Sequence, residues 1–456
     1  MSDPTLTWRR SVPIRHAVDV LVIGGGPAGI AASLAAARLG ASVLLIEQTG
    51  TLGGMGTSGL VPGFCPMGDG KRVIVGGIGR EIVDRLRAAG WTGPGDRPGR
   101  WSGWIPFQVE SLKLLYDQMI TEAGITLRFL TTLVDVVTEG RRLKHVIVAG
   151  REGAYAIHAQ SFVDATGDGL LSTLAGAAHE IGDETGALQP PTLCSIFANV
   201  DWKAFQRFRR KGLPGNAVQE TVERAITEGF FTTPDRHHPG AFRTGQRLAG
   251  MNVGHVHGTN AVDDVQLTQA MIRGRRVVQE NLAFYRKYIP GFEHAELATT
   301  GSLLGVRETR RIVADYTLTA DDFVARRSFP DQIGRYNYAI DLHPTVATTQ
   351  AYEAFLKEFQ EQYRYKPGES YGIPLRSLIV RDLDNVMVAG RCMGTDRKMQ
   401  GSTRVMPCCF ITGQAAGVTA AMAVEKDGAV RNVEADHVVH QLKKTGAYIP
   451  EPSKSS

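Results

Sequence analysis

The sequence contains few cysteines, and none are spaced as a metal site or a redox disulfide requires. Its 456 residues include five cysteines, Cys65, Cys194, Cys392, Cys408 and Cys409, and no two of these are separated by two residues. A sparse, odd-numbered set excludes a disulfide-stabilised secreted framework and a zinc ribbon. The adjacent Cys408 and Cys409 are either a redox pair or, more simply, buried thiols at a helix start. A reduced, cytoplasmic location is the expectation.

The sequence also lacks a strong excess of charge. Its 51 Lys and Arg residues nearly balance 46 Asp and Glu residues, for a net charge of +5. Spread over this length, that charge argues against a nucleic-acid partner and against an anionic membrane surface. The hydrophobic fraction of 43% and the charged fraction of 21% are those of a globular protein and exclude a disordered chain.

No clear targeting or membrane-spanning segment is present. The N-terminal stretch has charged residues where a signal peptide would have an apolar core. Val20–Ala37 runs for eighteen residues without a charge, but Gly24, Gly25, Gly26 and Pro27 interrupt it near its start. The segment therefore indicates a buried strand, a glycine turn and a helix, and no membrane association is expected.

Glycine is the abundant residue type. Fifty-two of the 456 residues are glycine, against a usual ~7%. They cluster at Gly24–Gly29, Gly50–Gly59 and Gly167–Gly169 and form no repeat. Such clusters are typical of loops in which the backbone must approach a ligand closely.

The first cluster lies within a predicted βαβ unit. Asp19–Ile23 and Ala41–Ile46 are short apolar strands, and Ala28–Leu39 is an alanine-rich helix that Gly40 ends. The turn between the first strand and the helix reads G-x-G-x-x-G, and Glu47 follows the second strand. This context is the dinucleotide-binding fingerprint, in which the helix N-terminus binds a diphosphate and the acid binds a ribose diol.

Further loops extend this predicted site. The glycine-rich run 51–59 can wrap the other end of an extended cofactor, with Thr57 and Ser58 as hydroxyl donors, and NAD-binding domains do not need it. Asp164-Ala-Thr-Gly-Asp-Gly169 and Ala389-Gly-Arg391 each end a strand in a tight turn. No second G-x-G-x-x-G follows a strand, so a separate NAD(P)H domain is not predicted.

Taken together, these motifs resemble a known family. The glycine turn, Glu47, Leu52-Gly-Gly54, Asp164-Ala-Thr-Gly-Asp168, Gly305-Val-Arg-Glu-Thr-Arg-Arg-Ile312 and the stretch Gly401–Gly417 look like the FAD-dependent oxidoreductases related to fumarate reductase and succinate dehydrogenase flavoprotein subunits. The resemblance is closest to a bacterial branch of general FAD-dependent oxidoreductases and extends from about residue 18 to 423. It implies FAD, noncovalent or covalent, with its isoalloxazine ring near Gly401–Pro407. A covalent link at Cys65 is a remote alternative.

The fold expected from the fingerprint and the resemblance is α/β. A Rossmann-like, glutathione-reductase-like FAD-binding domain comprises residues 1–184 and 371–456, and an inserted α+β substrate or capping domain comprises residues 185–370. The predicted cofactor contacts are Gly24, Gly26, Pro27, Ala28, Gly29, Glu47, Gly53, Gly54, Thr57, Ser58, Thr166, Gly167, Asp168, Gly390, Arg391, Gly401, Ser402 and Val405. A helix beginning near Pro407 would direct its positive end at the flavin N1/O2 locus.

Arginines are the first candidates for catalysis. Arg391, Arg397 and Arg404 lie in one segment that joins a strand end to a helix start, where doubly wound folds gather ligands. Relatives usually carry histidine at the position of Arg397, and arginine is the proton donor in related fumarate reductases. If residues 307–313 form a strand, Arg307 and Arg311 share a face and can hold a substrate carboxylate or pair internally with Glu308.

Histidines are the second candidates. His255 and His257 would share a strand face, and His343 lies two residues from Asp341. These residues can transfer protons, orient a substrate, or simply occupy core and surface positions. As a His/His/Asp set they could also bind a metal, but no metal is predicted, because nothing in the sequence brings them together.

The predicted function is an FAD-dependent oxidoreductase that moves a hydride between flavin N5 and a small polar substrate bearing a carboxylate or a hydroxyl. Electrons would come from or go to that substrate, an external carrier or oxygen, and the sequence is compatible with a homo-oligomer. The alternative is a flavin-bearing electron-transfer subunit that docks an iron–sulfur partner. A catalytic cavity at the domain junction would favour the enzyme, and a broad exposed patch near the flavin edge would favour the subunit.

Overall fold

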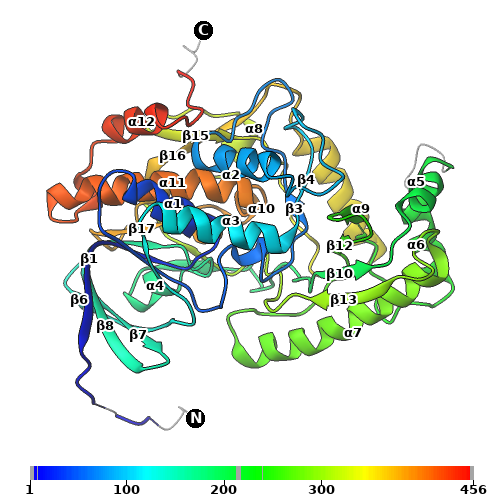
Figure 1. Ribbon diagram of the computed structural model, residues 1–456, viewed down its shortest axis with the longest axis horizontal. Coiled ribbons are helices and arrows are strands. Elements are labelled where there is room, and N and C mark those ends of the chain that lie inside the picture. The colour runs from blue at the N-terminus through cyan, green and yellow to red at the C-terminus, as the bar shows by residue number, and fades with distance from the viewer. Residues whose placement is uncertain (1–4, 8, 212–216, 239, 452–456) are drawn as a thin grey trace.

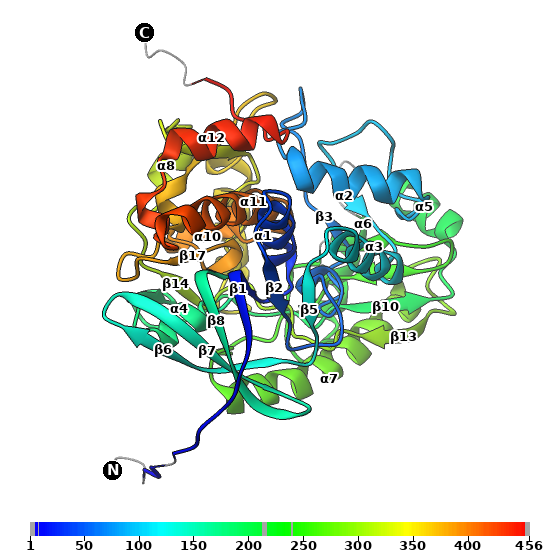
Figure 2. The same ribbon diagram turned by 60° about the vertical axis from the view of Figure 1, so that its left-hand side comes forward.

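The computed structural model describes residues 5–7, 9–211, 217–238 and 240–451. Residues 1–4 and 8, which belong to the N-terminal stretch interpreted above, lie outside the described part of the chain. The described residues form two main sheets and the helices that cover them (Figures 1 and 2).

The larger sheet has seven strands. Its order is β5 (Thr126–Arg128), β2 (Val43–Ile46), β1 (Ile14–Ile23), β8 (Gly153–Asp164), β7 (Arg142–Gly150) and β6 (Thr132–Glu139), and β17 (Val386–Val388) also pairs with β8. β5, β2, β1, β8 and β17 are parallel, whereas β7 and β6 are antiparallel additions. The central strands are buried on both faces, as their unbroken apolar runs predict. The carboxyl ends of β1, β2, β8 and β17 therefore meet along one edge.

Two helices cross on one face of this sheet. α1 (Pro27–Ala37) and α11 (Met406–Ala423) are almost entirely buried and pack along one another. Their close approach requires glycine: a Cβ at Gly413 would lie 2.1 Å from the Ala28 carbonyl oxygen, and one at Gly417 would lie 2.1 Å from that of Ala32. The residues 24–37 and 401–424, far apart in the chain, thus form one layer.

The remaining helices complete this layer. α2 (Gly77–Ala88) and α3 (Val109–Glu122) are amphipathic and bury their apolar stripes against α1 and α11, while α12 (Ala435–Lys444) packs on α11. The predicted helix at 28–39 is confirmed within two residues at each end. α11 together with its extension, Met406–Lys426, is long and apolar enough to cross a membrane, but 83% of its most apolar window is buried inside the protein.

The smaller sheet has its own core. Its order is β11 (Ala241–Arg243), β12 (Ala249–Met251), β10 (Ser195–Ala198) and β13 (Glu296–Thr300), all antiparallel. The helices α5 (Trp202–Lys211), α6 (Ala217–Thr227) and α7 (Asp264–Tyr288) accompany it, in green at the right of Figure 1. A hydrophobic cluster running from Leu193 to Leu304 joins these elements.

The chain from β14 onward returns to the first core. β14 (Arg310–Ile312) pairs with β9 (His179–Ile181), β15 (Gln332–Tyr336) pairs with β16 (Tyr371–Pro374), and α8 (Ala320–Val324) and α9 (Thr349–Lys357) lie between. Phe323, Tyr336 and Tyr371 belong to the same cluster as α1 and α11. The α/β fold with a dinucleotide-binding sheet and a smaller inserted layer is confirmed, and the boundaries at 184 and 370 stay predictions.

Three local expectations were wrong. The strand expected at 307–313 is only β14, at 310–312, so Arg307 lies in irregular chain. Residues 255–257 follow β12 and form no strand. The segment 391–404 is not one loop, because α10 (Arg397–Thr403) begins inside it, with the Asp396 carboxylate accepting the Met399 N–H at 2.6 Å as its N-cap.

Candidate active site

A cavity of about 850 Å³ lies between the two sheets. Its walls include the carboxyl ends of β1, β2, β8 and β17, the starts of α1 and α11, and residues of the smaller sheet such as Cys194, Phe242 and Asn252. The cavity is therefore at the strand edge where doubly wound folds bind ligands. The expected covering of the site by the inserted layer matches this lining.

The glycine turn forms one part of this wall. Gly24 has a φ of +99°, and a Cβ at Gly29 would lie 1.8 Å from the Gly24 carbonyl oxygen, so neither position admits a side chain. No atom lies within 4 Å of where a Cβ of Gly26 would be, which leaves open room at the start of α1. Among the described residues no side chain caps this helix, so its N–H groups face the cavity uncompensated.

Glu47 lies beside this turn, at the end of β2. Its carboxylate is 7% exposed and accepts the Gly25 N–H and the Thr49 N–H, each at 2.7 Å. Because a carboxylate has about four acceptor positions, it can still bind a ribose diol across the cavity that it lines.

The following glycine loop contributes less than expected. Gly54 and Met55 line the cavity, but Gly53, Thr57 and Ser58 do not. The Thr57 hydroxyl donates to the Leu52 carbonyl at 2.6 Å and so is used inside the loop. Thr57 and Ser58 as cofactor hydroxyl donors stay predictions that this geometry does not favour.

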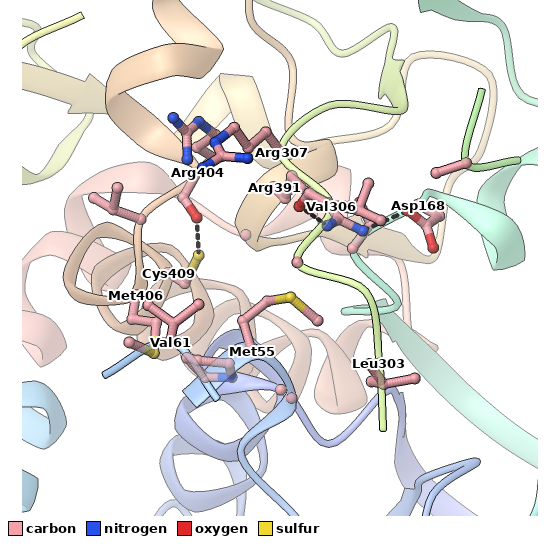
Figure 3. A pocket seen from close by; sticks show the side chains of 18 of the residues that line it. Met55, Val61, Asp168, Leu303, Val306, Arg307, Arg391, Arg404, Met406 and Cys409 are labelled. Atoms are coloured by element: carbon pink, nitrogen blue, oxygen red, sulfur yellow. Dashed lines mark hydrogen bonds and ion pairs between the residues drawn. The ribbon is translucent and has the colours of Figure 1, made fainter. Parts of the chain in front are cut away.

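The turn after β8 supplies a charged edge. Thr166, Gly167 and Asp168 line the cavity, and Arg391, which follows β17, forms an ion pair with Asp168. The Arg391 guanidinium also donates to the Gly167 carbonyl at 2.8 Å and to the carbonyl of Val306, as Figure 3 shows in part. Arg391 is therefore held by three acceptors and positions this turn.

The start of α11 forms another part of the wall. Val405, Met406 and Cys409 line the cavity, and among the described residues no side chain caps this helix. The helix begins beside Pro407, as predicted. Gly401 and Ser402 lie instead within α10, where the Ser402 hydroxyl donates to the Tyr338 carbonyl at 2.5 Å, so they face the segment before Asp341 rather than the cavity.

Two arginines occupy one side of the cavity near α11. Arg307 and Arg404 both line it, and their guanidinium groups lie together in Figure 3. Arg404 donates to the Asp341 carboxylate at 3.1 Å, whereas Arg307 donates only to the Pro190 carbonyl at 2.7 Å and the Thr192 hydroxyl at 3.0 Å. Burial, and next the charge of Arg404, lower the pKa of Arg307 to about 10. Of these two cations, only Arg404 pairs with a carboxylate among the described residues, which leaves this wall receptive to an anion.

Arg397 has a different environment. Its guanidinium donates to the fully buried Glu308 carboxylate at 2.9 Å and lies 3.6 Å from Asp183, and it does not line the cavity. Glu308 also accepts from Arg311 at 3.0 Å. Arg397 therefore belongs to an internal ion-pair network, and Asp396 is engaged as a helix cap. Its catalytic role stays a prediction that the geometry does not favour.

The predicted histidines divide between the wall and the layer behind it. His343 lines the cavity, whereas His255 and His257 do not. The structure brings His255 and His343 into direct hydrogen bonding at 2.8 Å, although 88 residues separate them. His257 instead hydrogen-bonds the Thr345 carbonyl at 3.1 Å. Sequence analysis missed His237 and Tyr338, which also line the cavity, and Asp235, which pairs with His255.

All five cysteines are free and buried. Cys65 and Cys409 line the cavity, but burial raises the pKa of both thiols, that of Cys409 to about 12. A protonated thiol is a poor nucleophile, so the geometry favours neither a covalent link at Cys65 nor a redox pair at Cys408 and Cys409.

Most of the predicted site residues come together. The cofactor contacts that line the cavity are Gly24, Gly26, Pro27, Ala28, Glu47, Gly54, Thr166, Gly167, Asp168, Gly390, Arg391 and Val405. A glycine turn at a helix start, an acid at the next strand end and a long cavity between two layers define a dinucleotide-binding enzyme. The family model "FAD dependent oxidoreductase" matches residues 19–443, and the chain belongs to this family. FAD is therefore its cofactor, and it fits the open room at Gly26 and the free acceptor positions of Glu47.

Curated relatives match only in part. Dihydrolipoyl dehydrogenase of Trypanosoma brucei brucei is 47% identical over 47 residues, which are 10% of each chain. Thiamine thiazole synthase of Aeropyrum pernix is 33% identical over 132 residues, which are 28% of this chain and 43% of that protein. The chain thus matches less than half the length of either relative.

Solved structures match over most of the chain at low identity. A geranylgeranyl bacteriochlorophyll reductase-like protein of Thermoplasma acidophilum is 13% identical with a TM-score of 0.46, over 94% of this chain and 83% of that one. The p-nitrophenol 4-monooxygenase of Pseudomonas putida is 11% identical with a TM-score of 0.45, over 94% and 88%. The relation to fumarate reductase and succinate dehydrogenase flavoproteins stays a prediction.

Proposed function

We propose that this FAD-dependent enzyme transfers a hydride between flavin N5 and a small substrate that carries a carboxylate. The observation that supports the proposal is the pair Arg307 and Arg404 on the wall of the cofactor cavity, where Arg404 pairs with the Asp341 carboxylate and Arg307 is hydrogen-bonded to neutral groups. Two guanidinium groups can bind a carboxylate through paired N–H donors, which fixes its orientation as well as its position.

The cofactor, the start of α11, the smaller sheet and the two arginines have separate roles in this proposal. Bound FAD supplies the two-electron chemistry. The uncapped start of α11 favours negative charge close to Val405 and Met406, and the smaller sheet covers the cavity and excludes water. Arg307 and Arg404 bind the substrate carboxylate, and this holds the reacting carbon in one geometry.

The enclosed position of this wall favours an enzyme over an electron-transfer subunit. A subunit that passes electrons to an iron–sulfur partner needs an exposed flavin edge, whereas residues of the smaller sheet and of α9, such as Phe242 and Phe355, line the cavity here.

Anaerobic spectroscopy of the purified holoprotein tests the proposal. We expect flavin absorbance to bleach with one of a panel of hydroxy acids and amino acids, or the reduced protein to be reoxidised by an unsaturated acid. The corresponding esters and amides should be at least about 100-fold poorer, because they lack the charge that the arginines bind. If neutral alcohols, amines or sugars react as fast as any acid, the proposed carboxylate site is wrong.

Arg404→Ala supplies the matching variant. We expect it to slow substrate-driven flavin reduction about 100-fold, or about 3 kcal/mol, with flavin content retained. Arg376→Ala is the control, since Arg376 pairs with Asp331 outside the cavity. Equal losses in both variants would contradict a role for Arg404 in binding.

A further inference from the structure

Four buried side chains behind the arginine wall form a continuous hydrogen-bonded chain. His255 Nδ1 lies 3.2 Å from Asp235 Oδ1, His255 Nε2 lies 2.8 Å from His343 Nδ1, and His343 Nε2 lies 3.3 Å from Asp341 Oδ2. The four side chains are between 2% and 13% exposed. They come from three segments, after α6, after β12 and after β15.

The number of protons in this chain follows from its geometry. Each of its three contacts joins two atoms that carry lone pairs, so each needs a proton between them. Two neutral imidazoles supply only two protons. The fully hydrogen-bonded chain therefore holds one additional proton.

The charges around the chain place this proton away from the carboxylates. Burial raises the pKa of the Asp341 carboxyl, but the charge and hydrogen bond of His343 and the charge of Arg404 outweigh it and hold that pKa well below its usual range. Burial likewise raises the pKa of the Asp235 carboxyl, but the charge and hydrogen bond of His255 outweigh this effect and hold that pKa well below its usual range. Burial and the charge of Arg307 lower the pKa of His343. The additional proton therefore resides on the pair of imidazoles rather than on either carboxylate.

We propose that Asp235, His255, His343 and Asp341 form a proton-transfer chain that exchanges one proton with the substrate, a role that rests on the function proposed above. In substrate reduction the flavin delivers a hydride with its electron pair to the substrate carbon, and the Nε2 proton of His343 passes to the neighbouring oxygen or nitrogen. The proton on His255 Nε2 then moves to His343 Nδ1, and the chain changes from three protons to two. Substrate oxidation runs the same transfers backwards and starts from the chain that holds two protons, the form that higher pH favours.

The two ends of the chain suit these tasks. His343 and Asp341 line the cavity and can reach a substrate held by Arg307 and Arg404, so His343 is the catalytic residue. Asp235 and His255 do not line it and act as positioning residues. The Asp235 carboxylate is held in place because it accepts the backbone N–H of His255 at 2.8 Å and the backbone N–H of His237 at 3.0 Å. The contact between His343 and Asp341, at 3.3 Å, is the longest of the three and lies at the cavity, where the proton enters and leaves.

Several other ionisable groups face the chain and contribute to its titration. They are His237 and His238 after α6, His257 after β12, Arg307 before β14, Tyr338 after β15, Arg404 after α10, and Cys65 after β3 (Gly63–Phe64). Burial, and next the charge of His255, lower the pKa of His237 to about 3, and burial likewise lowers that of His257. Both rings are therefore neutral at physiological pH and leave the additional proton to the chain.

A metal ion is the alternative occupant of this cluster. His237, His255 and His343 offer nitrogens within 4.8 Å of one another. Two imidazole nitrogens on one tetrahedral zinc ion lie about 3.3 Å apart, given Zn–N bonds of ~2.0 Å. The 2.8 Å between His255 and His343 is instead a hydrogen-bond distance, which favours a shared proton.

Histidine NMR of the ¹⁵N-labelled, FAD-loaded protein without substrate tests the proton count. We expect the rings of His255 and His343 together to carry three N–H protons at neutral pH, at least one of them slow to exchange with water. A resonance that disappears in His343→Gln or in His255→Gln belongs to the substituted ring, so either variant alone is sufficient to assign the signals of both rings. His294→Gln, at an exposed site, should remove only its own resonances. One proton per ring, or one tightly bound metal ion per chain by elemental analysis, would overturn the proposal.

Kinetics supply the second readout. His343→Gln should slow substrate-driven flavin reduction about 10²- to 10⁴-fold with KM changed far less, and the rise of that rate with pH should disappear. Asp235→Asn should shift the pH profile while flavin content is retained. An unchanged pH profile in both variants would overturn the proposed proton transfer through these four side chains. If no substrate in the panel reacts while three ring protons are observed, the proposed function is wrong, whereas the additional proton in the hydrogen-bonded chain of four side chains is confirmed.

Discussion

Glu47 is the residue predicted to bind the FAD ribose, and its carboxylate is buried beside the glycine turn. Its two oxygens also bind the Gly25 and Thr49 N–H groups, so the acid is rigid before FAD arrives. We expect Glu47→Gln to weaken FAD binding at least about tenfold, since a hydrogen bond to a charged group contributes ~1.5–3 kcal/mol. Titration of the apoprotein with FAD measures this, with the exposed Glu425→Gln as control. Equal affinities in both variants would remove the ribose assignment.

His238 should make stability depend on pH. Its ring is 3% exposed, packs near Phe231 and Phe284, and burial lowers its pKa. The unfolded chain, with a histidine pKa of ~6.5, then binds a proton that the folded chain does not, so stability falls as the pH drops below about 6.5.

His238→Phe isolates this contribution. It keeps an aromatic ring between the same neighbours and removes the titrating group, so the free energy of unfolding should decline less between about pH 6.5 and 5, by at most ~1.4 kcal/mol per pH unit. Urea unfolding at fixed FAD concentration measures the slope. Identical slopes for both proteins would show that His238 is protonated in the folded state.

At the residue scale, the sequence predicted the cofactor side better than the substrate side. Gly24, Gly26 and Glu47 lie in one short fingerprint whose geometry is local, and the cavity contains all three. Arg404 and Asp341 are 63 residues apart, and His255 and His343 are 88 apart. Such pairs depend on how distant segments pack, which composition and spacing do not encode.

At the scale of elements, the crossing of α1 and α11 holds the cofactor wall together. We expect Gly413→Ala to destabilise the protein by about 1–3 kcal/mol, because the new Cβ would lie 2.1 Å from the Ala28 carbonyl oxygen and force the helices apart. In a helix with free space the same change stabilises by up to ~1 kcal/mol. Thermal unfolding gives the sign, and an increase in stability would contradict this packing.

Element prediction succeeded where a pattern was long and failed where it was short. The helix predicted at Ala28–Leu39 is observed as α1, Pro27–Ala37. The strand expected at 255–257 is irregular chain after β12, and of the segment 307–313 only Arg310–Ile312 pairs with another strand, because so short a pattern does not determine strand pairing. Asp396 is a capping residue whose helix start at Arg397 was missed, although an aspartate followed by a helical run is a readable signal.

At the scale of the whole molecule, a cavity lies between two layers, and the predicted cofactor contacts and the proposed substrate contacts come from different parts of the chain. The larger sheet supplies the glycine turn and Glu47, while Arg307 and Asp341 come from segments that lead into and out of β14 and β15. The α/β fold and the FAD cofactor could be predicted because one fingerprint implies both. A covering layer was expected as well, but which of its side chains face the cavity could not be predicted, since that depends on contacts between sheets.

A crystal structure of the FAD-loaded protein with a bound small carboxylic acid tests the central claim most directly. We expect the ribose diol at Glu47 and the isoalloxazine ring beside the start of α11. The carboxylate should lie within hydrogen-bond distance of both Arg307 and Arg404, with His343 facing the oxygen or nitrogen on the reacting carbon. A flavin ring open to solvent, or a carboxylate bound away from both arginines, would contradict it.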